Sequence, residues 1–424
     1  MKFLYFLLCS CLFEVVLSAQ STLPVPVNLG QAVQEALEKN LGLLAEKYNL
    51  SIAEARIVTA RLRPNPVFSF GADYQDWLGA GFTPTKGVGP AEVNFRTDFL
   101  LERGGKRKSR IEVAEGARGV AELQLLNSTR TLLLDVENAF IEVILAKENL
   151  VLARENLKSF QEIVTINSAR VNAGDLAQVE LVRSRVAALQ FQNAVLQGES
   201  KLRTTRARLQ TLMGRSVPSP EFDVTGEFRR SDVPVVLTDL RVQALEQRPD
   251  LQALVHDQVR SLADIRQQEA LGKVDFTVGA QVHRQYGAGV QSPGNSLGVF
   301  FSMPVPVFNR NQGEIQRARQ EERQIEARIQ AARADILNEV ENAYQQFQTS
   351  TALLTSIETG MLQQARQVRE TTEYSYRRGE ASFVELLDAQ RAFNDTMQSY
   401  NEARAEFARS LYLIDSITGK GVNP

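Results

Sequence analysis

Few side chains in this sequence are of the types that catalyse reactions or hold metals tightly. The 424 residues contain two histidines, His256 and His283, which are far apart in the chain. After the first residue, the methionines form no local cluster: Met213, Met303, Met361 and Met397. Soft and borderline metals need clustered nitrogen and sulfur ligands. We therefore expect no metal site within the chain.

Enzyme motifs are also missing. Gly104-Gly105-Lys106 lacks the upstream glycine and the Ser/Thr after the lysine that a phosphate-binding loop needs. No G-x-S-x-G or H-E-x-x-H motif occurs. The 48 basic and 50 acidic residues nearly cancel, so no strong attraction to nucleic acid is expected. These observations predict a protein that is not an enzyme, binds no cofactor and has no nucleic-acid partner.

The N-terminus has the pattern of a signal peptide over residues 1–19. Lys2 precedes an apolar stretch that begins at Phe3, and Leu17-Ser18-Ala19 offers a cleavage site before Gln20. A lipoprotein box, Leu8-Cys9-Ser10-Cys11, is an alternative in which Cys11 is acylated. Both interpretations take the protein out of the cytoplasm. Cys9 and Cys11 are the only cysteines, so a chain cleaved after Ala19 has no disulfide.

The rest of the chain contains an internal sequence duplication. At an offset of 208 positions, Gly71-Ala72 falls on Gly279-Ala280 (279 − 71 = 208), and in a later block Gly174 falls on Gly379 at an offset of 205 (379 − 174 = 205). Long internal repeats indicate a duplicated structural unit. We divide the mature chain into a first repeat at 20–214, a proline-containing linker at 215–236 and a second repeat at 237–424.

Each repeat predicts a helix, two strands, a very long helix and a return helix. Residues 31–62 have the composition of one helix that ends before Pro64. The stretches 106–172 and 314–378 contain no proline and are expected to be continuous, with apolar residues recurring by threes and fours. Return helices are expected at 176–212 and 381–417. A return helix and the short helix before the strands, placed end to end, together have the length of one long helix. Each repeat therefore gives two parallel helical columns, and the chain gives four.

Between the helices the apolar period changes from 3.6 to two. The alternation predicts four strands of about 8–11 residues, the length that spans a bilayer when tilted. The candidate membrane-facing aromatic residues are Phe68, Phe70, Phe95, Phe99, Phe276 and Phe301. A half-buried soluble sheet alternates in the same way, but it needs a covering layer. The helices here are too long to fold back as that cover, and no later apolar run approaches a spanning helix.

Four strands cannot close a barrel, and an open edge inside lipid leaves backbone groups unpaired. We therefore expect the chain to assemble with copies of itself. A cyclic trimer gives twelve strands and twelve helical columns, whereas a dimer gives a barrel too narrow for a duct. The polar alternate positions would then face water inside the ring: Asn94, Arg96, Asp98, Thr277 and Gln281.

This duplicated plan resembles the TolC-like outer-membrane efflux factors over essentially the whole mature chain. Leu101-Glu102-Arg103-Gly104-Gly105-Lys106-Arg107 resembles a motif of the CzcC-type heavy-metal subgroup, and so does the segment from Met303 to Gly313. The resemblance implies a mainly α fold with a transmembrane β part. In it, a homotrimer forms a 12-strand outer-membrane β-barrel continued by a long periplasmic α-helical barrel.

The resemblance also implies a role and partners. The chain would be the outer-membrane channel of a tripartite efflux system in a Gram-negative bacterium, a passive conduit for heavy-metal cations. Its partners would be a periplasmic adaptor (membrane fusion protein), an inner-membrane RND-type pump and outer-membrane lipid. Multidrug efflux or type I secretion is an alternative cargo class, and a soluble periplasmic coiled-coil scaffold is an alternative without a membrane.

Four residues near the two turns are candidates for the periplasmic aperture, as the resemblance implies. Glu385 and Asp388 match the family's acidic stretch, Glu180 holds the matching place in the first repeat, and Tyr376 matches a tyrosine near the closed aperture. Rings of carboxylates attract cations. Charged residues on a solvated helix face are the plain alternative. Ala381 stands where some members have an arginine, which puts a salt-bridge latch in doubt.

The two turns between the long and return helices are candidate adaptor contacts: Gly174, Asp175, Gly379 and Glu380. Glycine is also simply what a helix C-terminus favours. A basic cluster at the start of the first long helix opposes the helix dipole: Arg103, Lys106, Arg107, Lys108 and Arg110. A lipid phosphate would compensate the positive charge of this cluster, and so would solvation by water. Trp77 is a candidate for an interfacial aromatic belt or an ordinary loop residue.

Overall fold

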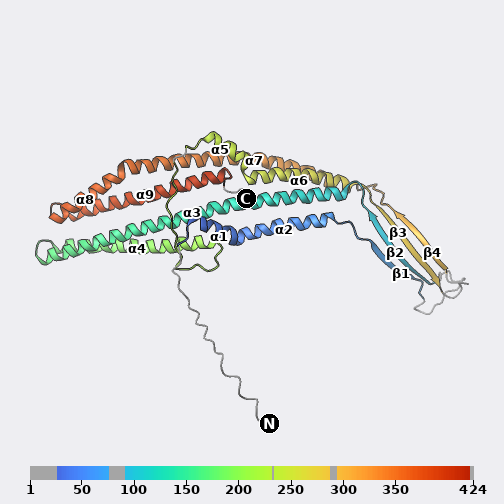
Figure 1. Ribbon diagram of the computed structural model, residues 1–424, viewed down its shortest axis with the longest axis horizontal. Helices are drawn as coiled ribbons and strands as arrows, with labels where there is room; N and C mark the ends of the chain where they lie inside the picture. Colours follow the sequence, from blue (N-terminus) through green and yellow to red (C-terminus); the bar gives the residue numbers. More distant parts are fainter. Residues whose placement is uncertain (1–25, 76–90, 232–233, 287–293, 421–424) are drawn as a thin grey trace, which may run out of the picture.

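The computed structural model describes residues 26–75, 91–231, 234–286 and 294–420, and in them a sheet extends from one end of a long helical bundle (Figure 1). The predicted signal peptide, Cys9, Cys11 and Trp77 lie outside the described residues. No described helix has both the length and the apolarity of a membrane span.

Both repeats have the same order of elements. The first contains α1 (Leu29–Lys39), α2 (Leu41–Arg61), β1 (Val67–Asp73), β2 (Ala91–Leu101), α3 (Lys106–Asn172) and α4 (Gln178–Leu212). The second contains α5 (Leu237–Gln247), α6 (Pro249–Leu271), β3 (Phe276–Tyr286), β4 (Gly294–Ser302), α7 (Gln312–Ser356), η1 (Ile357–Met361), α8 (Leu362–Arg378) and α9 (Phe383–Ile417).

The predicted long helices are present. Helix α3 has 67 residues, a length of about 100 Å at 1.5 Å per residue. Its counterpart α7–α8 is also continuous but contains the π-helical turn η1, which the sequence did not predict. Within η1, Glu358 pairs with Arg230 and accepts a hydrogen bond from the Tyr400 hydroxyl at 3.2 Å. The return helices α4 and α9 each begin two residues later than predicted.

The single helix expected over 31–62 is wrong, because the chain breaks at Asn40. Asn40 caps α2 by accepting a hydrogen bond from the Leu43 N–H, and its amide donates to the Leu212 carbonyl at 2.9 Å. Gly214, at φ +80°, comes so close that a Cβ there would lie 2.2 Å from the Lys39 oxygen. The break therefore lets the end of α4 meet the α1–α2 corner, and the two form one column beside α3 (Figure 1).

The second repeat breaks at the matching residue, Arg248 (248 − 208 = 40). Arg248 precedes Pro249, and a residue before proline is disfavoured in a helix. Its guanidinium is 4% exposed and bonds Asp250 and Glu339. Gly419, at φ +71°, packs against the Gln247 oxygen as Gly214 packs against that of Lys39.

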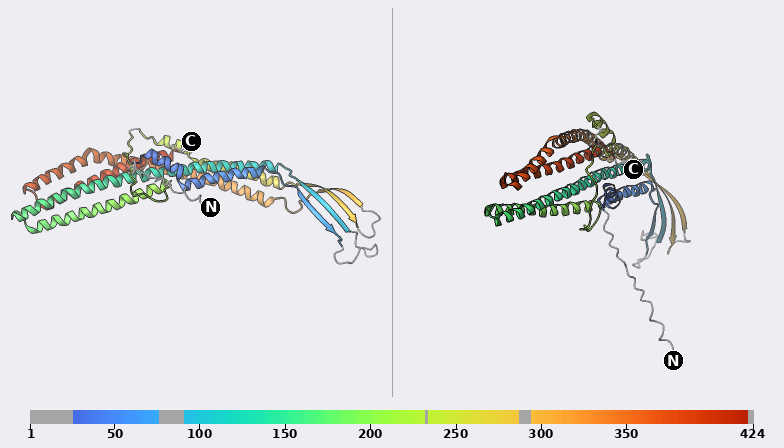
Figure 2. Two further views of the ribbon diagram at one scale, coloured as in Figure 1. Left: turned by 60° about the horizontal axis from the view of Figure 1, so that its bottom comes forward. Right: turned by 60° about the vertical axis from the view of Figure 1, so that its left-hand side comes forward.

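The four strands form one antiparallel sheet in the order β1-β2-β3-β4. Phe70 pairs with Phe95, Leu101 with Phe276 and Val278 with Phe301, so the predicted apolar positions share one face. Strands β1 and β4 are the two edges, and neither edge is paired in the described sheet. The sheet projects beyond the helices, which do not lie over it in the views of Figures 1 and 2.

The core is divided along the length of the molecule. Its largest cluster lies at mid-length, where α1, α3, α4 and the segment after α4 meet, and includes Val136, Phe140 and Leu209. Residues of the predicted linker belong to it, because Phe222, Val224 and Phe228 are buried and Val27 bridges to Val224. Smaller clusters join α5, α7 and α9, and the far ends of the hairpins. The described part of the predicted linker, residues 215–231, therefore packs against the helices.

Part of the basic cluster at the start of α3 is neutralised within the chain. Lys106 is 7% exposed and bonds Asp275 at 2.6 Å, and the Arg103 N–H donates to the same carboxylate at 2.8 Å. Arg110 bonds Glu102 at 2.8 Å and also donates to the carbonyl of Leu62. These contacts join the helices to the sheet, so Lys106 and Arg110 need no lipid phosphate.

Candidate aperture and membrane face

The two hairpin ends have the same backbone geometry. Gly174 and Gly379 both have φ +83°, and the residue after each donates a backbone hydrogen bond across the turn, from Asp175 to the Arg170 oxygen at 2.8 Å and from Glu380 to the Ser375 oxygen at 2.9 Å. This left-handed cap is why glycine stands at both positions. The turns end the bundle opposite the sheet (Figure 1).

Glu385 and Asp388 lie on the first turns of α9, beside the second hairpin end, and both are exposed. Glu385 forms a capping box: the Ser382 N–H donates to Glu385 Oε2 at 2.6 Å, and the Glu385 N–H donates to Ser382 Oγ at 3.2 Å. The hydrogen bond from the Ser382 backbone lowers the pKa of Glu385. These two carboxylates are three residues apart and share one side of the helix.

Glu180 differs from Glu385 although both are the third residue of their helix. The cap of α4 is Ala177, which has no side chain to complete a box. Glu180 instead accepts a hydrogen bond from Arg183 at 2.8 Å, and its side chain is 23% exposed. In the first repeat, the carboxylate of Glu180 is therefore paired with an arginine. In the second repeat, the carboxylate of Glu385 caps its helix and has no cationic partner among the described residues.

Tyr376 is buried between the two hairpins. It is 4% exposed, packs in a cluster with Phe160, Phe383 and Leu386, and donates its hydroxyl proton to Asn167 Oδ1 at 2.7 Å. Burial raises the pKa of its hydroxyl. In this arrangement Tyr376 fastens α8 to α3, and Ala381 packs at the edge of the same cluster.

A row of hydrogen-bonded polar side chains, the polar seam, lies between α3 and α9 and was not predicted from the sequence. Asn156 donates to Asn394 at 2.7 Å and accepts from Gln390 at 2.8 Å, and the Asn401 amide donates to Asn149 at 2.9 Å. Asn149, Asn156 and Asn167 of α3 are spaced by seven and eleven residues (156 − 149 = 7; 167 − 156 = 11). Both spacings return to one helix face. That recurrence was a signal available in the sequence.

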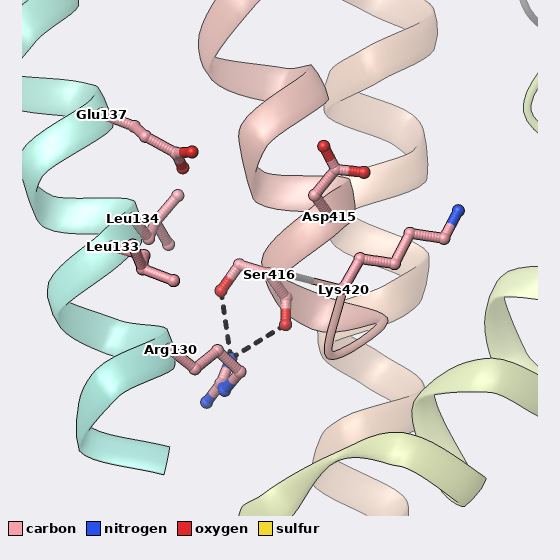
Figure 3. A pocket seen from close by; sticks show the side chains of 7 residues that line it. All are labelled: Arg130, Leu133, Leu134, Glu137, Asp415, Ser416 and Lys420. Carbon is pink, nitrogen blue, oxygen red and sulfur yellow. Dashed lines mark hydrogen bonds between the residues drawn. The ribbon is translucent and has the colours of Figure 1, made fainter. Parts of the chain in front are cut away.

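At mid-length, α3, α9 and the residues after α9 line a cavity of about 240 Å³ (Figure 3). Arg130 closes one end by donating to the Ser416 carbonyl at 3.3 Å and the Ser416 hydroxyl at 3.2 Å. Glu137 and Asp415 face the cavity from opposite helices. Burial, with the nearby Asp415 charge, raises the pKa of Glu137 to about 7.

The six candidate phenylalanines lie on the uncovered face of the sheet. Phe68 and Phe70 contact Phe95, with ring centroids 6.2 Å and 5.1 Å apart, and Phe276 contacts Phe301 at 5.2 Å. Phe68 is 66% exposed and Phe301 64% exposed in the single chain. Rows of exposed aromatic and branched side chains on a sheet mark an interaction surface.

Metal-ligating side chains remain sparse in the structure. Within the described ranges, no group of three or more His, Cys, Asp or Glu residues is placed to hold a metal ion. His283, which the sequence left without a partner, lies 3.5 Å from Glu92 on the polar face of the sheet. This pair joins two neighbouring strands.

Comparisons with known proteins agree with this geometry. The family model described as "Outer membrane efflux protein" matches residues 32–215 and 240–420. The cobalt-zinc-cadmium resistance protein CzcC of Cupriavidus metallidurans is 24% identical over 405 residues, covering 93% of this chain and 90% of CzcC. The pyoverdine export outer membrane protein OpmQ of Pseudomonas putida is 26% identical, with coverages of 86% and 80%.

A third relative has a solved structure. The cation efflux system protein CusC of Escherichia coli K12 is 22% identical over 395 residues, covering 90% of this chain and 84% of CusC. A crystal structure of CusC superposes with a TM-score of 0.76 at 17% identity, covering 94% of this chain and 93% of that chain. At that identity the likeness establishes the fold.

The duplicated bundle with its projecting sheet is thus the fold of the TolC-like outer-membrane channels. The chain belongs to the outer membrane efflux protein family. Its members are channels rather than enzymes, and its place is the outer membrane, with the helices extending into the periplasm.

Proposed function

We propose that three copies of this chain form one outer-membrane conduit, a 12-strand barrel continued by a helical barrel, that exports heavy-metal cations. The observation that carries the assembly is the sheet, which has two unpaired edges and an apolar face that no helix covers. Inside lipid, unpaired backbone groups are costly, so each β4 edge pairs with the β1 edge of the next copy. Three such joints close the ring.

The opposite face of the sheet suits a wet lumen. Arg96 bonds Asp98 at 2.8 Å and stacks on Phe300, and Asn94 donates to Asp73. Thr277 and Gln281 lie on the same side by register. Charges paired along a strand are stable in water but not in lipid. This face therefore lines the duct, while the six phenylalanines contact lipid.

At the periplasmic end, Glu385 and Asp388 of three copies would form two acidic rings around the axis, to which Glu180 contributes less because Arg183 pairs it. Fixed negative rings attract cations and repel anions. Tyr376 and its bond to Asn167 hold the hairpins together at this level. We assign the aperture to this region.

Support for a metal cargo comes from the names of relatives and from the acidic exit. CzcC is a cobalt-zinc-cadmium resistance protein and CusC a cation efflux system protein. The CzcC-like segments at 101–107 and 303–313 lie at the two sheet-to-helix connections. The chain would conduct the cations without a resident binding site.

The partners follow from this role. The hairpin ends, with Gly174, Asp175, Gly379 and Glu380, are exposed beyond the bundle and are the surfaces that a periplasmic adaptor would contact. An inner-membrane RND-type pump would supply the substrate and the energy. Each copy would consist of repeats at 20–214 and 237–424 joined by residues 215–236, with a signal peptide at 1–19.

A complementation experiment tests the cargo. The gene is expressed in a Gram-negative strain that has its own metal pump and adaptor but lacks the outer-membrane component. Restored growth in Co²⁺, Zn²⁺ or Cd²⁺ with unchanged sensitivity to organic drugs supports metal export. Restored drug resistance without metal resistance would assign the chain to multidrug efflux instead.

A further inference from the structure

The two connections from the sheet to the long helices differ in length. Residues 102–105, four in number, join β2 to α3, whereas residues 303–311, nine in number, join β4 to α7. The longer connection begins Met303-Pro304-Val305-Pro306-Val307-Phe308. Neither the barrel nor the aperture gives this apolar stretch a role.

Its side chains are among the most exposed apolar groups of the molecule. Phe308 is 91% exposed, the highest value for a large apolar side chain in the described residues, and Val305 and Val307 are 73% and 62% exposed. Three large apolar groups within four residues are not the scattered singles that a soluble surface tolerates. They call for a covering partner.

The exposure is built into an ordered backbone. The Gln312 amide donates to the Phe308 carbonyl at 3.1 Å, and Arg310 Nε donates to the Pro306 carbonyl at 3.2 Å. Asn311 fixes the far end by donating to the Gln268 carbonyl on α6 at 2.8 Å. These bonds hold the backbone in one conformation, so Val305, Val307 and Phe308 are presented to the surroundings at little cost in conformational freedom.

The segment continues the membrane face of the sheet. Strand β4 shows Leu297, Val299 and Phe301 on that face, at 76%, 78% and 64% exposure. Residues 303–308 follow directly, at the end of the sheet nearest the helices. On the proposed function, that end lies at the periplasmic leaflet of the outer membrane.

Three basic residues surround the base of the segment. Gly104, which follows Arg103, packs against the Lys273 side chain, and the Gly272 backbone packs against the Arg310 carbonyl. The Arg103 guanidinium stacks on the Phe276 ring, 4.4 Å from its centroid, and within the described part of the chain no carboxylate pairs with Arg103, Lys273 or Arg310. Cations without an acidic partner, placed beside an apolar surface, match the phosphates of a lipid leaflet.

We propose that residues 303–308 are an interfacial anchor: Val305, Val307 and Phe308 insert into the periplasmic leaflet, and Arg103, Lys273 and Arg310 contact the lipid phosphates. The anchor fixes the height of each copy in the bilayer on the β4 side. This inference rests on the proposed outer-membrane assembly.

A neighbouring copy is a poorer occupant. Its β1 edge would bring residues 62–66 beside this segment, and the only charged residue there is Arg63. Arg63 would repel Arg310 and leave the three basic groups without a counter-charge. Lipid supplies both the apolar layer and the phosphates.

Tryptophan depth measurements test the anchor. The sequence has one tryptophan, so Trp77→Phe gives a silent background for Phe308→Trp. The full-length protein is reconstituted in phosphatidylcholine–phosphatidylglycerol vesicles whose lipid chains carry bromine near the headgroup or near the chain end. We expect blue-shifted emission and several-fold stronger quenching by the bromine near the headgroup. Val305→Trp is a second reporter at the same level.

Two further single-tryptophan variants locate any failure. Val299→Trp on the sheet should be quenched by bromine, and Val151→Trp on the helical bundle should not. Loss of quenching at Val299→Trp contradicts the membrane assembly itself. Quenching at position 299 but not at 308 or 305 overturns the anchor alone. In that case, red-shifted emission from positions 308 and 305 means that they face water. Blue-shifted but unquenched emission from them means that they pack against another copy.

Discussion

The contact between Ser382 and Glu385 joins local folding to the proposed electrostatics of the aperture. The bond from the Ser382 N–H starts α9 and also lowers the pKa of Glu385. A carboxylate with a lowered pKa stays charged as the pH falls, so the ring that it forms would persist in a mildly acidic periplasm. Asp388 has no partner of this kind among the described residues.

The first prediction replaces both carboxylates, as Glu385→Gln with Asp388→Asn. Glutamine at position 385 can still complete the capping box, so the helix should start unchanged. The cation-to-anion permeability ratio in planar bilayers should fall towards one. Glu402→Gln, on the same helix but away from the aperture, is the control and should leave the ratio unchanged. An unaltered ratio in the double variant would reduce both residues to a solvated surface.

The second prediction concerns Glu137 at the mid-length cavity, where Asp415, Arg229, Arg130, Lys420 and Tyr412 are the neighbouring charged or titratable groups. Because its folded pKa is about 7, the folded state binds a proton that the unfolded state has lost above about pH 4.5. This group therefore lowers the free energy of unfolding as the pH rises from about 4.5 to 7.

Glu137→Gln removes that titration. We expect the variant to be more stable than the parent at pH 8 by about 1–3 kcal/mol and nearly equal to it at pH 4.5. Thermal unfolding in detergent at the two pH values measures the difference. Asp135→Asn, on the exposed side of the same helix, is the matched control for removing one carboxylate. Equal gains at both pH values would mean that ionisation of Glu137 is not the cause.

At the scale of elements, the polar seam between α3 and α9 makes the third prediction. Asn156 and Gln390 are each 3% exposed, and each bonds the other. Asn156→Leu leaves a buried amide without a partner and should cost about 1–3 kcal/mol of unfolding free energy. Adding Gln390→Leu should recover part of the loss, because the buried amide left without a partner is then gone, while Asn394 still lacks its donor. Asn193→Leu on exposed α4 is the control, and additive losses in the double variant would contradict a coupled seam.

The fourth prediction concerns the corner between α1 and α2. Gly214→Ala places a Cβ at φ +80° and 2.2 Å from the Lys39 oxygen, so it should cost at least about 2 kcal/mol or prevent folding. Gly419→Ala, at 2.9 Å from the Gln247 oxygen, should cost less. Gly360→Ala has open space and should be neutral or slightly stabilising. Thermal unfolding ranks the three, and equal midpoints would show that the corner is not fixed by glycine.

The elements differ in how well the sequence predicts them. The long helices and four strands follow from local periodicity, and their bounds agree with the structure to within a few residues. The break at Asn40 does not, because an asparagine alone is tolerated in a helix. The break depends on Gly214, which lies far along the chain and meets the corner only after folding. Glu358 in the turn η1 likewise contacts residues distant in sequence, Arg230 and Tyr400.

In the candidate site, too, some features follow from the sequence and others depend on long-range packing. The exposure of Glu385 and Asp388 and the left-handed glycines at the hairpin ends follow from sequence position alone. The burial of Tyr376 against Asn167 and the pairing of Glu180 with Arg183 depend on how two hairpins meet. Long-range packing of this kind leaves little trace in one sequence.

At the scale of the whole molecule, the proposed trimer accounts for what one chain leaves unpaired and uncovered. The helical part of one chain has buried clusters, but in the described residues its sheet has neither a covering layer nor paired outer edges. A soluble periplasmic scaffold would have to leave this sheet exposed to water, which invites aggregation. Assembly in lipid resolves both deficits together.

The most direct test is the mass of the purified protein. In detergent that excludes free lipid, native mass spectrometry should give three copies per particle, and removal of the detergent should precipitate it. A stable, monodisperse single chain in detergent-free buffer would contradict the account, because the sheet would then need neither lipid nor a second copy.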